Sequence, residues 1–201
     1  MYDKINITEN SLQVITLFTK GFNREYYIRE VQRLVKISPR TSQLILEDLE
    51  SKGILESKLR GKIKTYKLQF NETTKRYLIL IEQYKILSYL KNNNFIKEII
   101  EKISPHINGI GLIFGSYAKG IEKKGSDLDI FIAGEYNKDE IKKISKTYGL
   151  DISIKCYPIK TFENNINQDF LLKEILKNHI IFSNTELFIE NVLKWLKSNG
   201  V

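Results

Sequence analysis

Two aspartates two positions apart are the residues of this sequence best suited to chemistry. Asp127 and Asp129 lie in the segment 126–132, which alternates apolar and polar residues as a strand does. Alternate side chains of a strand share a face, so both carboxylates would leave the same face with Cα atoms about 7 Å apart. Such a pair favours a compensating cation, and Mg²⁺ suits it because this hard ion takes carboxylate and phosphate oxygens. The alternative is a sheet end where both acids merely face water.

A third acid stands in a second alternating segment, residues 150–155. There Asp151, Ser153 and Lys155 share one face. If this strand lies beside the first, three carboxylates converge, as they do in two-metal sites that activate an attacking oxygen and stabilise a leaving one. Lys155 could neutralise developing charge, or it could be a structural counter-ion to Asp151.

A turn of small residues precedes these acids. Gly115 and Ser116 follow a short apolar strand expected at 109–114 and lead toward a helix. Such a turn leaves backbone N–H groups free and lets a phosphate approach closely. It is also a common helix entrance, so its meaning depends on the acids that follow.

The combination of Gly115-Ser116, ten intervening residues, Asp127-x-Asp129 and the later acid Asp151 resembles the signature of minimal nucleotidyltransferases of the DNA polymerase β superfamily. The resemblance covers about residues 93–201. It includes an ending, 172–182, in which a helix leads into a short apolar strand. It implies a small mixed-sheet domain that transfers a nucleoside monophosphate, AMP from ATP, to a hydroxyl and releases pyrophosphate.

The resemblance also implies the metal ligands. Asp127 and Asp129 would hold two Mg²⁺ ions, and Asp151 would complete one of the two sites and help to deprotonate the acceptor hydroxyl. Catalysis would then rest on positioning and charge neutralisation.

Nucleotide binding is implied in the same way. Gly115 and Ser116 would bind the β- and γ-phosphates, with Lys119 and Ser126 as weaker candidates for the same tail. Many relatives carry Arg where this chain has Lys119. Lysine keeps the charge but lacks the bidentate fork for phosphate, so nucleotide affinity is expected to differ.

The first third of the chain follows another pattern. Three helices and then two strands are expected from apolar periodicity, at residues 12–18, 27–35, 39–52, 54–59 and 63–70. Ser38 is a good cap for the third helix and Pro39 a good first residue. The turn Arg60-Gly61-Lys62 would join the two strands as a hairpin.

This order resembles a winged helix-turn-helix domain, in which the third helix enters the major groove of DNA and the hairpin touches the backbone or the minor groove. Arg and Gln can read base edges, whereas Lys holds phosphate. The expected DNA contacts are Arg40, Thr41, Ser42, Gln43, Lys58, Arg60, Lys62 and Lys64. Residues 1–70 hold 13 Lys and Arg against eight Asp and Glu. Such domains also serve in protein docking and dimerisation, so that alternative stays open.

The sequence therefore predicts an α+β protein in three parts: a winged helix-turn-helix domain at 1–70, a connecting helix at 71–92 and a nucleotidyltransferase domain at 93–201. Apolar residues cover more than one face of the connecting helix, so it must be covered on several sides. Packing between the two domains would do this. Formation of a homodimer through the helix would also do it, and would suit a DNA binder that reads two half-sites.

Composition narrows the class of protein and its partners. The chain has 201 residues, a net charge of +8, one cysteine and two histidines, which excludes a disulfide-stapled miniprotein and a zinc finger. The basic balance permits nucleic acid, nucleotide phosphate or an acidic protein as partner. No secretory signal and no apolar run of about 20 residues are present, so we expect a cytoplasmic protein without a membrane partner.

Small relatives of this kind look like the antitoxin half of toxin–antitoxin pairs, in which AMP is transferred to a tyrosine of a separate HEPN-type toxin. The leading prediction is therefore such an enzyme, with a DNA-binding domain for autoregulation. One alternative is a transcriptional regulator that senses nucleotide without turnover. Another is nucleotide addition to RNA or to a small molecule, although little chain remains for an acceptor-binding domain.

Overall fold

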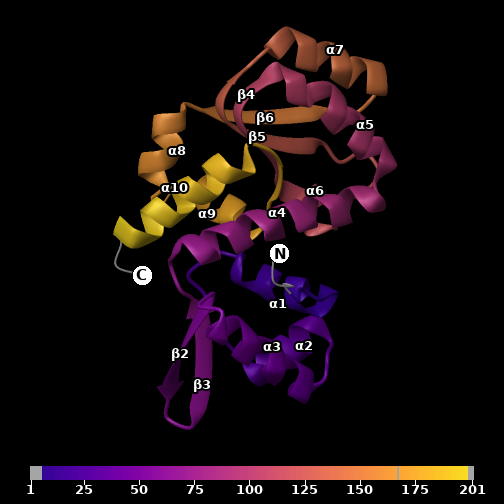
Figure 1. Ribbon diagram of the computed structural model, residues 1–201. Coiled ribbons are helices and arrows are strands. Elements are labelled where there is room, and N and C mark those ends of the chain that lie inside the picture. The colour runs from indigo at the N-terminus through magenta and orange to yellow at the C-terminus, as the bar shows by residue number, and fades with distance from the viewer. Residues whose placement is uncertain (1–5, 167, 199–201) are drawn as a thin grey trace, which may run out of the picture. The chain divides into compact units, whose positions relative to one another are not determined.

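The computed structural model describes residues 6–166 and 168–198 (Figure 1). The chain forms two compact units that divide between Ile81 and Glu82. This division falls inside helix α4 (Glu72–Lys91), which lies within the range 71–92 expected for the connecting helix. Among the described residues, no helix is long and apolar enough to cross a membrane.

In the part of the first unit that the structure describes, helices α1 to α3 and the start of α4 accompany a small antiparallel sheet of strand order β1-β3-β2. Its elements before α4 are α1 (Glu9–Phe18), β1 (Tyr26–Tyr27), α2 (Ile28–Val35), α3 (Pro39–Ser51), β2 (Leu55–Arg60) and β3 (Ile63–Leu68). Helix α3 begins as expected, because Ser38 Oγ accepts from the Thr41 amide at 3.0 Å and Pro39 stands in the first turn. Gly61 forms the hairpin turn with φ of +62°.

The second unit is built around a mixed sheet of strand order β6-β5-β4-β7. Strands β5 and β6 are parallel, and the other two pairs are antiparallel. The elements after α4 are α5 (Asn94–Ile103), the 3-10 helix η1 (Ser104–His106), β4 (Ile107–Ile113), α6 (Gly115–Lys119), β5 (Leu128–Tyr136), α7 (Lys138–Tyr148), β6 (Ile152–Tyr157), α8 (Ile159–Asn165), α9 (Phe170–Lys177), β7 (Ile180–Ser183) and α10 (Thr185–Ser198).

Helices cover both faces of this sheet. Ile130 and Ile132 of β5 belong to a buried cluster with Ile99 of α5 and Ile141 of α7. On the other face, the Phe131 ring lies 5.4 Å from Tyr157 and 5.9 Å from Phe162 of α8, measured between centroids. The alternation of β5 thus fixes which face meets α5 and α7, and it leaves Asp129 on the face of Phe131.

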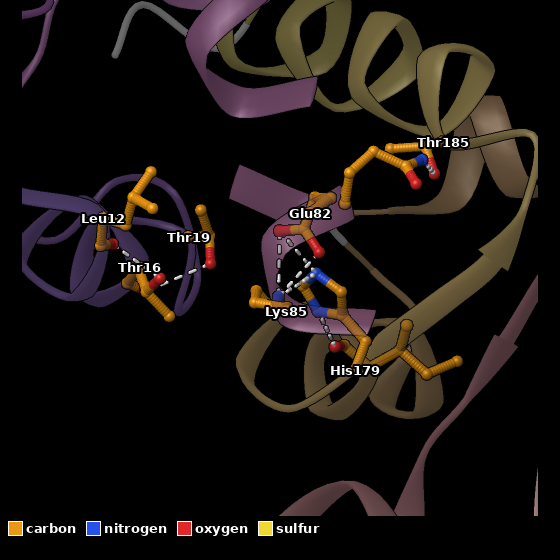
Figure 2. A network of polar contacts seen from close by, with 9 residues as sticks. Leu12, Thr16, Thr19, Glu82, Lys85, His179 and Thr185 are labelled. Carbon is orange, nitrogen blue, oxygen red and sulfur yellow. Dashed lines mark hydrogen bonds and ion pairs between the residues drawn. The ribbon is translucent and has the colours of Figure 1, made fainter. Parts of the chain in front are cut away.

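A buried cluster of charged and titratable side chains joins α4 to the segment before β7 (Figure 2). Lys85 Nζ lies 2.7 Å from Glu82 Oε2 and 3.1 Å from His179 Nε2, while His179 Nε2 lies 3.3 Å from Glu82 Oε1. His179 Nδ1 lies 2.8 Å from the Ile175 carbonyl, which can only accept, so Nδ1 carries a hydrogen. Each charge thus has a partner, as buried charges require.

Candidate active site

The turn after β4 lies directly against one acid of the predicted Asp127/Asp129 pair. Gly115 begins α6 with φ of +69°, and a Cβ added there would lie 2.2 Å from Asp129 Oδ2. The neighbouring Phe114 amide donates to the Asp129 carbonyl at 3.0 Å. Only glycine fits this approach, so the sequence brings a backbone turn and a carboxylate into contact.

The two acids differ in position. Strand β5 begins at Leu128, so the exposed Asp127 stands just before it and the half-buried Asp129 within it. Burial raises the pKa of Asp129, and the nearby charge of Asp127 raises it further. A hydrogen bond from Ser153 and the charge of Lys155 act in the opposite direction. Asp129 is therefore a carboxylate that a nearby cation would stabilise.

The parallel register of β5 and β6 determines what lies beside these acids. Asp129 is opposite Ser153, and the Leu128 amide donates to the Asp151 carbonyl at 2.8 Å. The backbone of Asp151 is therefore adjacent to the Asp127 segment, which meets the condition set for the two segments, although strand β6 begins at Ile152 and not at residue 150. Within residues 6–166 and 168–198, no three or more His, Cys, Asp or Glu side chains group so that they could hold a metal ion. The expected three-carboxylate cluster is thus not formed by these side chains.

The two weaker phosphate candidates have structural contacts. Lys119 Nζ lies 3.9 Å from Glu174 Oε2 of α9. Ser126 closes the loop before β5, because its Oγ accepts from the Lys123 amide at 3.0 Å and its own amide donates to the Lys123 carbonyl. Ser126 therefore shapes the loop that leads to Asp127.

One comparison with known proteins bears on this site. A family model described as polymerase beta, nucleotidyltransferase, matches residues 85–187, just over half of the chain. The chain belongs to this family. The matched segment contains the Gly115 turn and both acids of the pair, and its members are nucleotidyltransferases by description.

Other similarities are distant. No curated protein matches the chain. One solved structure with a detectable likeness is TrmBL2, an archaeal chromatin protein described as showing a novel mode of DNA binding. It has 15% identity, and the match covers 79% of this chain and 68% of that one with a TM-score of 0.26. At that TM-score the likeness says nothing about function.

Ser153 is the site residue of this nucleotidyltransferase that sequence reasoning did not select. The alternation of 150–155 placed Ser153 on the same face as Asp151, but the strand register was needed to set it beside Asp129. A hydroxyl that donates to a carboxylate favours the ionised form. Ser153 therefore lies beside Asp129 and lowers the pKa of that carboxyl.

The residues of α3 that were expected to contact DNA differ in their exposure and in their hydrogen bonds. Ser42 is fully buried and its Oγ donates to the Ser38 carbonyl, so its prediction as a DNA contact is wrong. Its helical position points it into the unit, beside the cap that starts α3. Thr41 contacts Ser38 at 2.8 Å, and Gln43 Nε2 donates to Glu47 at 2.8 Å. Arg40 is exposed at the start of the helix.

Most of the expected cations of the hairpin are paired within the unit. Lys58 and Arg60 lie 2.7 Å and 3.0 Å from Glu25 Oε1. Lys64 lies 2.7 Å from Glu50 Oε2. Lys62, next to the turn glycine, is exposed and has no ion pair among the described residues. The turn therefore carries a cation that is open to a ligand.

Proposed function

We propose that the second unit transfers AMP from ATP to a hydroxyl group. The observation that carries this proposal is the contact between the Gly115 turn and the Asp129 carboxylate. It sets backbone N–H groups, which suit phosphate, beside an acid pair, which suits the cation that accompanies phosphate. Family membership supports nucleotidyl transfer as the reaction class.

The donor set fits Mg²⁺. Asp127 and Asp129 supply two carboxylates, and Mg²⁺ in proteins commonly takes one or two carboxylates together with substrate phosphate oxygens. Asp151 is our candidate for a further ligand, because its backbone is adjacent to the Asp127 segment. When bound, the metal would neutralise charge on the triphosphate.

The chain's own groups have separable tasks in this proposal. The amides of Gly115 and Ser116 bind the β- and γ-phosphates and so orient the α-phosphorus. The acceptor oxygen forms a bond to that phosphorus while the bond to the pyrophosphate oxygen breaks, and Asp151 takes the hydroxyl proton. Lys155 adds positive charge to the same face of the sheet as Asp129.

The acceptor that we propose is a tyrosine on a separate helical toxin of the HEPN type. This assignment follows from the resemblance of the motif segment to antitoxin nucleotidyltransferases. Incubation of the chain with α-labelled ATP, Mg²⁺ and the product of its neighbouring gene should transfer label to that protein. Asp129→Asn should abolish the label, whereas Asp139→Asn, an exposed acid in α7, should not.

The same experiment separates the alternatives. Equal labelling by the Asp129→Asn variant would reject the catalytic site. Nucleotide binding without any labelled product would favour a nucleotide sensor, a reading consistent with the missing three-acid cluster among the described side chains. Label on RNA or on a small molecule instead of protein would reject the proposed acceptor and leave the proposed AMP transfer intact.

We further propose that the first unit is a winged helix-turn-helix domain that binds the DNA upstream of its own gene. The exposed cations Arg40 and Lys62 support this function, since neither has an ion pair among the described residues. Affinity of the full chain for that duplex should fall steeply with salt. Lys62→Ala should reduce the slope of log affinity against log salt by about 0.9, and Lys142→Ala, an exposed lysine of α7, should not. Binding that salt leaves unchanged would favour a protein-docking role.

A further inference from the structure

Phe170, the first residue of α9, is the most exposed large apolar residue of the part of the chain that the structure describes. It is 80% exposed, and no aromatic ring of the described residues contacts it. Phe95 of α5, by contrast, is 49% exposed and its ring lies 6.0 Å from Tyr148 between centroids. Single exposed apolar side chains are common on protein surfaces, so the surroundings of Phe170 decide its meaning.

The first turn of α9 is fixed to the face of the sheet that carries Asp129. The carboxylate of Asp169, which caps the helix, accepts from the Tyr157 hydroxyl at 3.0 Å. Tyr157 and Ser153 are four positions apart in β6, so their side chains share a face, and Ser153 is opposite Asp129. Phe170 therefore directly follows a residue that is anchored to the face of the candidate active site.

One turn further along, α9 contacts the helix that begins with the proposed phosphate turn. Glu174 Oε2 of α9 lies 3.9 Å from Lys119 Nζ of α6. Residues three or four positions apart share a helix face, so Phe170 shares a face with Glu174, and Ser116 shares one with Lys119. The ion pair thus joins the face of α9 that carries Phe170 to the face of α6 that carries Ser116.

We propose that Phe170 is the platform on which the base of the bound nucleotide stacks. This inference rests on the proposed function, because it takes Gly115 and Ser116 as the site of the β- and γ-phosphates. A nucleotide carries its base at the other end of the molecule, so the base lies beyond this turn. Every base has a π-face that stacks on an aromatic side chain. The two contacts that fix α9 also hold the platform in place, so little freedom is lost when the base binds.

The residues around Phe170 on α9 favour a nucleotide over a protein partner. A protein-docking surface needs a contiguous apolar patch. The neighbours of Phe170 on the same helix face are the charged residues Lys173, Glu174 and Lys177. One isolated ring among charged side chains instead fits a flat ligand with a charged tail. Because stacking uses the π-face and not the base edges, Phe170 should contribute equally to the binding of ATP and GTP.

The test measures binding of ATP, GTP and inorganic tripolyphosphate to the full chain by calorimetry in the presence of Mg²⁺. We expect Phe170→Ala to weaken binding of both nucleotides about tenfold and to leave tripolyphosphate, which has no base, unchanged. Phe170→Trp should restore nucleotide binding. In transfer assays Phe170→Ala should raise the KM for ATP and leave kcat almost unchanged, as expected for a lost binding contact.

Phe95→Ala is the matched control, because it removes an exposed ring from another helix of the same unit. It should bind all three ligands as the parent chain does. Melting temperatures verify that each variant folds.

The other outcomes reject the platform in different ways. If Phe170→Ala binds ATP as the parent does, the platform is wrong and the proposed function stands. If it loses tripolyphosphate as strongly as ATP, the substitution disturbs the phosphate turn and stacking is rejected. If it reduces label on the protein acceptor without a change in ATP affinity, the ring contacts the acceptor instead. If the parent chain binds neither ATP nor tripolyphosphate, both proposals fail.

Discussion

Charged side chains are arranged differently in the hairpin of the first unit and at the candidate active site of the second. In the hairpin, hydrogen bonds from Lys58 to Glu25 and from Lys64 to Glu50 lower the pKa of each glutamate. At the site, burial and the neighbouring acid raise the pKa of Asp129. Opposite charges that already neutralise one another stabilise a local structure, whereas neighbouring carboxylates keep an unfavourable energy that a bound cation would remove.

The cluster of Glu82, Lys85 and His179 pairs opposite charges as the hairpin does, but in the protein interior. Burial raises the pKa of Glu82, but the charges of Lys85 and His179 and their hydrogen bonds outweigh this effect and lower the pKa to about 2. The carboxylate of Glu82 thus has its counter-charges within the protein. This difference explains why we assign function to the acid pair and structure to the cluster.

Of the substitutions considered, Gly115→Ala should have the largest effect, because it disturbs the candidate active site. The new Cβ would meet Asp129 Oδ2 at 2.2 Å, so the turn and the carboxylate must separate. We expect nucleotidyl transfer to fall at least about a hundredfold, as when a positioned group is lost from an active site. Transfer assays on the purified chain measure this.

Gly120→Ala is the matched control for that substitution. Gly120 has a similar φ, +65° against +69° for Gly115, but a Cβ added there meets no atom within 4 Å. Both variants carry the strain of a left-handed alanine, about 1 kcal/mol, and only one carries the collision. Equal losses of transfer in the two variants would assign the effect to strain and remove the argument for the turn.

The sequence predicted most of the elements because their signals are local. Ser38 and Pro39 start α3 where expected, and the alternation from Leu128 to Ile132 identified β5 and its buried face. Gly61 marked the hairpin turn. Helix caps, turn glycines and apolar periods act within a few residues, so a single sequence shows them.

Contacts between segments that are distant in the sequence were harder to predict from the sequence alone. The placement of Ser153 opposite Asp129 depends on the register of two strands that are joined by a helix. The expectation of three clustered carboxylates assumed side-chain directions that the pattern alone does not fix. The pairing of Glu25 with Lys58 and Arg60 also joins residues more than thirty positions apart. Such contacts follow from tertiary packing, which periodicity does not determine.

Lys85→Met should have the second largest effect, on stability. The substitution leaves Glu82 buried with His179 as its remaining partner in the cluster, and breaking a buried ion pair costs about 3 kcal/mol. Lys143→Met removes an exposed ion pair with Glu140 and should leave the melting temperature almost unchanged. Urea unfolding at pH 7 measures the difference. Similar free energies of unfolding for both variants would contradict a structural role for the cluster.

Acid should weaken the same cluster. The folded-state pKa of Glu82, about 2, lies below its usual value of 4.5, so its ionised form stabilises the fold above pH 4.5. That contribution should fall as pH drops from about 4.5 toward 2, because the unfolded chain then binds a proton that the folded chain does not. A Glu82→Gln variant should lose the parent's steep decline in that range when unfolding is followed by circular dichroism. An unchanged decline in the variant would assign acid sensitivity to other carboxylates.

The smallest expected effect comes from Glu25→Gln, which turns the paired arrangement of the hairpin into an unpaired one. Glu25 is the common partner of Lys58 and Arg60, and both cations are exposed. Since exposed pairs contribute about 0–1 kcal/mol, stability should change little. The two released cations should raise affinity for duplex DNA about threefold and steepen its salt dependence.

Asp139→Asn removes an acid of the second unit and should leave affinity unchanged. If Glu25→Gln leaves the salt slope of the parent chain intact, Lys58 and Arg60 do not face the phosphates, and the hairpin's charge is structural in the same sense as the buried cluster.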